Sequence, residues 1–443
     1  MSSIISSHAT ATPAAARYSR FRLGRRWNGW AGAKMTCRPE LVDLADGQRR
    51  LMLQVWRKHH PLWLAPHRPF FLLAGLWAAI VPLAWLAPPG LGPEPLSWHR
   101  HEMLFGMGGA AVGGYLLTAL PAWTHDGAVS PRTTRLLVAL WIVGRIAFMS
   151  APHSPVTLAA TSCFFLALGS FLSQQAARAK AWRRLPLAVS PFILAAFELL
   201  SSSGPASAYE ATHMRAMPLF YALLISLVGG RAILAFSRHW GEHSQSLPFV
   251  ADTRWVSQGA VSALIVAIVS MLFEKDAVAA SLAVLSGLAQ FSCMLRWRSW
   301  KTLRYPALFL LHLAWLWLSF GLVLVGFSLL SVSHVSTMTA LHALTMGAMG
   351  TMLIAIMGRA AMTRQGSRLV LSPVLALAFA LVFLAAAVRL WASVGGSWGG
   401  PFMLYLAAVL WITGWVLFLW NFRHALCGEV PRPVLSARFG ATP

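Results

Sequence analysis

Two stretches of the sequence share one pattern, His101-Glu-Met-Leu-Phe-Gly106 and His342-Ala-Leu-Thr-Met-Gly347. In each, a histidine is followed five residues later by glycine, and further small residues come next. Both stretches lie near the start of a long apolar run, so each places an imidazole above a face of small residues. Whether these runs cross a membrane decides the fold.

The composition is that of a membrane protein. Of 443 residues, 57% are hydrophobic and 11% are charged, whereas a soluble protein carries about 25% charged residues. The formal charge of +23 suggests nucleic-acid binding, but the Lys and Arg residues lie in short breaks between apolar runs, which excludes it. No pair of the four cysteines has CxxC spacing, so a zinc knuckle or a thioredoxin-like site is not supported.

We predict an all-α polytopic membrane protein with twelve transmembrane helices, because twelve apolar segments approach the roughly 20 residues that cross a bilayer. Residues 1–66 are expected to form a basic, disordered tail without a signal peptide, and Met35 or Met52 is an alternative start. The membrane domain is predicted over 67–425, followed by a short tail at 426–443. The predicted spans are 70–88, 99–121, 134–151, 155–176, 185–201, 214–236, 256–273, 277–295, 305–330, 336–359, 372–392 and 401–420.

The loops between these spans alternate in charge. One set carries nearly all the arginines, and the other carries Glu94, Glu210, Glu274, Lys275, Asp276 and little else. The positive-inside rule then places both termini in the cytoplasm. Spans 99–121 and 336–359 both run inward, so His101 and His342 are predicted at similar depths near the outer side. One planar cofactor such as haem would fit between them if the two spans pack together.

Histidines inside hydrocarbon are candidates for function. We rank His101 and His342 first as metal ligands, and His99 next. His99 and His101 are about 200° apart around a helix, so they do not ligate the same iron. The alternative is that these are interfacial histidines bonded to backbone or water, and the small residues equally fit close helix packing.

Further candidates lie elsewhere in the spans. His312 is closer to the cytoplasmic side and would serve a second centre. His213 and His334 lie near outer helix ends, close in sequence to several methionines, and imidazole with thioether suits copper. Arg145 and Arg389 are predicted in the outer half, where either would pair with haem propionates. Snorkelling, or an Arg145–Glu198 pair, is the competing interpretation.

The same segments resemble the NnrS family of bacterial membrane proteins. The resemblance extends over roughly 65–425, and Thr363-Arg-Gln-Gly-Ser-Arg368 departs from it, with Arg364 at the place of a family histidine. The matching blocks are His67-Arg-Pro-Phe-Phe-Leu-Leu73, Trp98-His-Arg-His-Glu-Met-Leu-Phe-Gly106, Tyr115-Leu-Leu-Thr-Ala-Leu-Pro-Ala-Trp-Thr124, Gly229-Gly-Arg-Ala-Ile-Leu-Ala-Phe-Ser237, Leu311-His-Leu-Ala-Trp-Leu-Trp317 and Leu341-His-Ala-Leu-Thr-Met-Gly-Ala-Met-Gly350.

The resemblance implies an inner-membrane protein of a bacterium that contains haem and copper and acts in the response to nitric oxide, often in denitrifying organisms. It makes His101 and His342, then His99 and His312, the family-matching candidate ligands. The expected partners are the lipid bilayer, nitric oxide or a related small ligand, and an electron donor. Catalytic residues and catalytic turnover are not predicted. The alternatives are a small-solute transporter or channel, which twelve spans also suit, and an assembly scaffold for a reductase.

Overall fold

The computed structural model describes residues 60–86, 94–152, 154–201, 208–243, 251, 253–330, 335–365, 368–394 and 400–427, and 89% of it is helical. Eleven helical segments in these ranges are long and apolar enough to span a membrane. The chain is therefore a multi-pass, all-α membrane protein, as predicted. The twelfth predicted span, 185–201, coincides with helix α8 (Leu185–Ser201), whose 17 residues are one turn short of a typical span.

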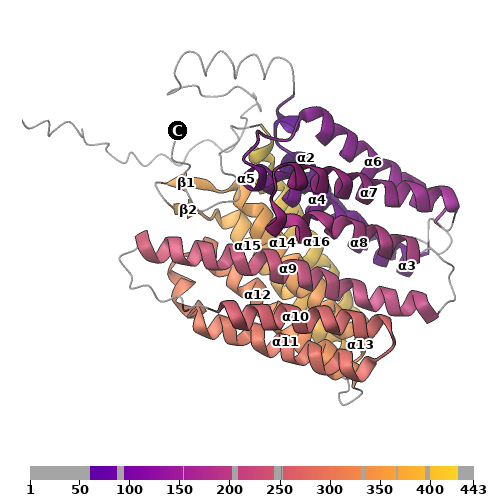
Figure 1. Ribbon diagram of the computed structural model, residues 1–443. Coiled ribbons are helices and arrows are strands. Elements are labelled where there is room, and N and C mark those ends of the chain that lie inside the picture. Colours follow the sequence, from indigo (N-terminus) through magenta and orange to yellow (C-terminus); the bar gives the residue numbers. More distant parts are fainter. Residues whose placement is uncertain are drawn as a thin grey trace, which may run out of the picture. The chain divides into compact units, whose positions relative to one another are not determined.

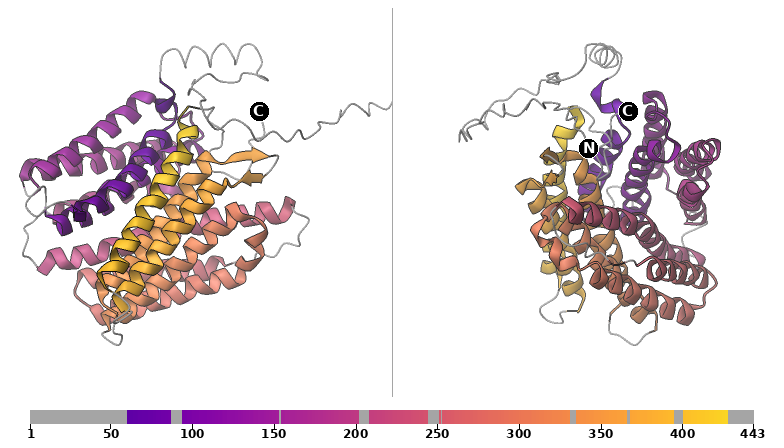
Figure 2. Two further views of the ribbon diagram at one scale, coloured as in Figure 1. Left: turned by 180° about the vertical axis from the view of Figure 1, so that it is seen from behind. Right: turned by 60° about the vertical axis from the view of Figure 1, so that its left-hand side comes forward.

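The helices follow the chain order in two groups (Figures 1 and 2). The first contains α2 (His67–Ile80), α3 (Pro95–His101), α4 (Gly109–Ala119), α5 (Pro121–Thr124), α6 (Pro131–Ser150), α7 (Pro155–Arg178) and α8. The second contains α10 (Arg254–Leu272), α11 (Asp276–Arg296), α12 (Pro306–Leu329), α13 (Thr337–His342), α14 (Thr351–Gly358), α15 (Pro373–Val394) and α16 (Pro401–Cys427). Helix α9 (Ala208–His243) joins them, because it packs on α8, α10 and α12.

Short elements complete the structure. Two π-helical segments, η3 (Glu102–Gly108) and η6 (Ala343–Gly350), join α3 to α4 and α13 to α14. Five 3₁₀ turns are η1 (Pro61–Leu64), η2 (Val81–Leu86), η4 (Trp182–Arg184), η5 (Ser299–Arg304) and η7 (Arg359–Ala361). A two-stranded antiparallel hairpin, β1 (Thr363–Gln365) with β2 (Arg368–Val370), forms where the sequence departs from the family pattern. It is the one departure from an all-α structure in the described ranges.

Several helices begin with the same local device. Ser130 and Ser154 each accept a hydrogen bond from the backbone N–H three residues on, and a proline occupies the next position. Glu94 caps α3 in the same way ahead of Pro95, and Ser336 caps α13. A side-chain acceptor satisfies a free N–H group, and proline at the first helical position has none to lose. These caps fix where the helices carrying the candidate histidines start.

The two spans with the His-x4-Gly pattern lie deepest in the bundle. In the most apolar 18-residue stretch of each of these two spans, 72% of the residues are buried. The corresponding fraction is 28% in α16 and 33% in α10 and α15. The segment η6 packs between α12 and α15, while α2 covers η3 and α4 (Figure 2). The repeated pattern therefore marks the centre of the fold.

Close packing of α11 on α12 gives a test of the fold. A Cβ added at Gly287 would lie 2.7 Å from the backbone oxygen of Ser319, which cannot move aside without displacing α12. We expect Gly287→Ala to lower the free energy of unfolding by about 1–3 kcal/mol, measured as a lower thermal midpoint in detergent. Gly259→Ala on α10 is the control, because nothing lies within 4 Å of its Cβ position. Equal midpoints for the two variants would contradict the packing.

Candidate functional site

Each histidine of the repeated pattern is followed directly by a π-helical segment. The α-helix α3 ends at His101 and η3 begins at the next residue, while α13 ends at His342 and η6 begins at the next residue. The wider π turn is rare and is frequently found at functional sites. The sequence repeat is thus a repeat of backbone geometry, which its spacing did not reveal.

The glycines of the pattern are packed against aromatic rings of the protein. A Cβ on Gly106 would lie 2.6 Å from the Trp77 ring, and one on Gly347 would lie 2.6 Å from the Trp317 ring. On α4, Gly109 and Gly113 face Phe165 and Phe164 of α7. These small residues serve close packing, the alternative raised from the sequence, and the expectation of an open face for a macrocycle is wrong at these positions.

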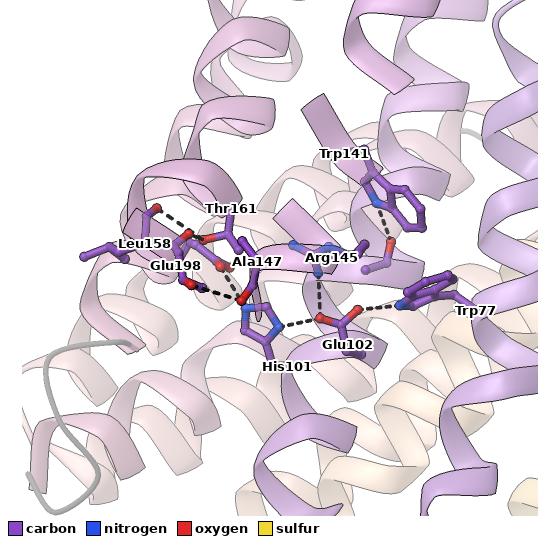
Figure 3. Close-up of polar contacts among 11 residues, drawn as sticks. Trp77, His101, Glu102, Trp141, Arg145, Ala147, Leu158, Thr161 and Glu198 are labelled. Carbon is purple, nitrogen blue, oxygen red and sulfur yellow. Dashed lines mark hydrogen bonds and ion pairs between the residues drawn. The ribbon is translucent and has the colours of Figure 1, made fainter. Parts of the chain in front are cut away.

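His101 belongs to a buried cluster of ionisable side chains. Its Nε2 lies 2.7 Å from Oε1 of Glu198 on α8, and its Nδ1 lies 2.9 Å from Oε1 of Glu102 (Figure 3). The same Glu102 oxygen accepts a hydrogen bond from Nη1 of Arg145 at 3.1 Å, and Glu102 Oε2 accepts one from the Trp77 indole. We call these four residues, His101, Glu102, Arg145 and Glu198, the ion cluster.

The ion cluster is balanced in charge. Carboxylate oxygens only accept hydrogen bonds, so an imidazole that bonds two carboxylates must donate from both nitrogens and is then a cation. Two cations then face two anions, which is how charges persist inside a membrane. The Phe148 ring stacks on His101 at 3.5 Å and 3°, a favourable position for a cation. Arg145 thus pairs with Glu102, and the Arg145–Glu198 pair considered from the sequence is absent from the ion pairs of the described residues.

His342 lies in a second group with His99 and Arg389. The Nδ1 atom of His342 lies 2.8 Å from the carbonyl oxygen of Met338, which can only accept a hydrogen bond. The proton is therefore on Nδ1, and Nε2 carries the lone pair that binds a metal. His342 lies within electrostatic range of both His99 and Arg389, and His99 lies within that range of Arg389. The histidine that the structure brings to His342 is thus His99.

Two buried polar atoms of this region have no hydrogen-bond partner in the described part of the chain. They are Nδ1 of His99 and the indole Nε1 of Trp317, which packs over Gly347. Buried polar groups are nearly always satisfied, so each of these atoms needs a partner, such as a water molecule or a bound ligand. Arg389 donates to Ser393 at 2.6 Å and has other donors left.

The remaining candidates are spread over the molecule. Both ring nitrogens of His312 are engaged, Nδ1 with Ser299 at 2.7 Å and Nε2 with Ser237 at 3.2 Å, so it links α12 to η5 and α9. His213 is buried on α9, and His334 lies outside the described residues. No group of three or more His, Cys, Asp or Glu side chains suited to a metal occurs in the described ranges.

The comparison with protein families now has a structural context. The model of the family described as NnrS protein matches residues 61–429. The chain belongs to the NnrS family. A search of curated proteins finds no match. At the level of the family, membership indicates a membrane protein related to nitric oxide that binds haem and copper.

The residues present fit part of that expectation. A backbone hydrogen bond orients the lone pair of His342, one ring nitrogen of His99 is unsatisfied, and the Arg389 guanidinium is nearby. This group suits a haem that is held by two histidines and carries anionic propionates. For copper, the described residues supply scattered histidines and methionines without a set of three donors. We therefore treat the group formed by His99, His342 and Arg389 as the candidate cofactor site.

The ion cluster predicts an asymmetric response to substitution. Arg145→Gln leaves the two buried carboxylates of the ion cluster with His101 as their one cation, and breaking a buried pair in this way costs about 3–5 kcal/mol. We expect low folded yield and a lower thermal midpoint, and partial recovery in the Glu102→Gln/Arg145→Gln double variant. Arg132→Gln, at an exposed position on the same helix, is the control. Full stability of Arg145→Gln would show that the pair is not buried in the folded protein.

Proposed function

We propose that this protein is an inner-membrane haem–copper protein that acts in the cellular response to nitric oxide. The observation that carries the proposal is the group formed by His342 and His99, on the two most buried spans, with Arg389 of α15, in a chain that belongs to the NnrS family. It supports the prediction that histidines of the second and tenth spans hold haem, with His99 in place of His101 as the partner of His342.

The chain's own residues have separable roles at this site. His342 would bind iron through Nε2, because its Nδ1–H is held by the Met338 carbonyl. His99 would supply the second imidazole, and Arg389 would pair with a propionate. The Trp317 indole would donate a hydrogen bond that no described group accepts. When bound, haem supplies one-electron chemistry, and a diatomic ligand would take the place of one of the two imidazoles.

His101, His312, His213 and His334 remain candidates for other roles. His101 would have to give up its contacts with Glu102 and Glu198 if it turned to bind iron, so we assign it to the ion cluster. His312 would need to break its hydrogen bonds with Ser237 and Ser299 in order to bind a metal. Copper prefers imidazole and, when reduced, thioether ligands, and His213 and His334 near the outer ends of their helices suit it, with Met214 and Met338 close in sequence.

We further propose twelve spans with both termini in the cytoplasm. Helix α8 would be the twelfth span, since its 17 residues extend roughly 26 Å. Its charged Glu198 is held by the ion cluster and does not face lipid. The sites around His99 and His342 then lie toward the periplasm, because the loop that precedes α3 belongs to the set poor in arginine.

The cofactor content of the purified protein tests the proposed function. The detergent-purified protein should contain iron in stoichiometric amount and copper, show sharp reduced haem bands, and change its spectrum on adding nitric oxide. His342→Ala should lose most of the haem, while His424→Ala, at an exposed position on α16, should retain it. A colourless, metal-free protein from haem-replete cells would contradict the proposal and favour a transporter for a small solute.

Reporter fusions test the proposed membrane topology. Fusion of green fluorescent protein after Pro443 should be fluorescent, and alkaline phosphatase fused at position 204, between α8 and α9, should be active because it is exported. An inactive phosphatase at this site would mean that α8 does not cross the membrane, which would contradict the proposal of twelve spans.

A further inference from the structure

An apolar pocket opens among α4, α8, α9 and α14 and their neighbours, and no residue of the ion cluster, nor His342, is part of its lining. Its volume is about 70 Å³, well below the roughly 300–1,000 Å³ of drug-sized sites, so it admits only a slender group. Aliphatic side chains form most of its lining, together with Met349, Met352 and Met357. It runs from Gly108, at the end of η3, along α4 to Tyr115, a length of roughly 10 Å. Such a narrow space suits part of an apolar chain.

Two arginines lie at one end of this pocket. Arg184 directly precedes α8, whose Leu187 and Ser190 line the pocket, and Arg231 follows the lining residue Gly229. Both arginines lie within electrostatic range of Tyr115, which also lines the pocket. Arg184 and Arg231 also act on each other. The end of the pocket at Tyr115 is therefore cationic, while its interior is apolar.

This arginine pair has no described counter-charge. None of the ion pairs in the described part of the chain involves Arg184 or Arg231. Two guanidinium groups that repel each other beside a membrane are stabilised when an anion binds between them. Phosphate suits this position, because arginine bonds it in a bidentate manner.

The position along the membrane normal agrees with a lipid headgroup. Arg184 ends one arginine-rich loop, and Arg231 lies one to two turns before another, which begins at Arg238. Both belong to the side that the positive-inside rule assigns to the cytoplasm, where anionic lipids are concentrated. Basic pockets between membrane helices on this side are typical binding sites for anionic headgroups.

We propose that this pocket holds part of an acyl chain of an anionic phospholipid whose phosphate is bound by Arg184 and Arg231. The inference does not depend on the proposed haem and copper. It assigns a bound lipid that links the first group of helices, through α4 and α8, to the second group, through α14, with α9 between them. Removal of the lipid would therefore loosen the contact between the two groups.

The test is lipid retention by the full chain. After exchange into a delipidating detergent, native mass spectrometry of the wild type should show one retained phosphatidylglycerol or cardiolipin. Arg184→Gln/Arg231→Gln should reduce this occupancy roughly tenfold or more, because each arginine contributes on the order of 1 kcal/mol to binding an anionic lipid. Arg183→Gln, an exposed arginine next to Arg184, is the matched control and should retain the lipid.

A second arm keeps the proposal testable if the double variant folds poorly. Val112→Phe should block the pocket and lower lipid retention with both arginines intact. Adding phosphatidylglycerol to delipidated wild type should raise the thermal midpoint more than phosphatidylcholine does. Equal effects of the two lipids, the same stabilisation by inorganic phosphate alone, or a neutral quinone as the retained molecule would overturn the proposal.

Discussion

The ion cluster is the interaction on which the rest of the structure depends. Four ionisable groups from α3, η3, α6 and α8 are buried where water cannot solvate them, so each must face an opposite charge. The cluster joins the α3–η3 segment to α6 and α8 through hydrogen bonds, and the Trp77 indole adds α2. It therefore fixes the rotation of α3 about its own axis.

That rotation determines which histidine faces the second group of helices. Successive helical residues turn by about 100°, so His99 and His101 point to nearly opposite sides of α3. With His101 held against Glu198, His99 is turned toward His342 and Arg389. The carboxylates thus have an indirect role in the proposed site, because they select the imidazole that is presented to the cofactor.

The sequence predicted the parts of this account that depend on local pattern. Apolar runs gave the membrane class and eleven of the spans, and the repeated His-x4-Gly pattern marked the two central helices. The sequence did not reveal partners across the fold. The ranking of His101 over His99 followed the repeat, but Glu198 lies 97 residues away from His101 and nothing local shows that it is the partner. Similarly, the glycines indicated a smooth face, and only the packing shows that Trp77 and Trp317 fill it.

The assignment of separate roles to His99 and His101 is the central claim, and haem content per folded molecule tests it most directly. His99→Ala and His101→Ala would be purified from haem-replete cells, and the reduced haem absorbance would be compared at equal amounts of monodisperse protein. The account predicts that His99→Ala loses haem, whereas the folded fraction of His101→Ala, although smaller and less stable, retains it. Haem retained by His99→Ala and absent from folded His101→Ala would contradict the account.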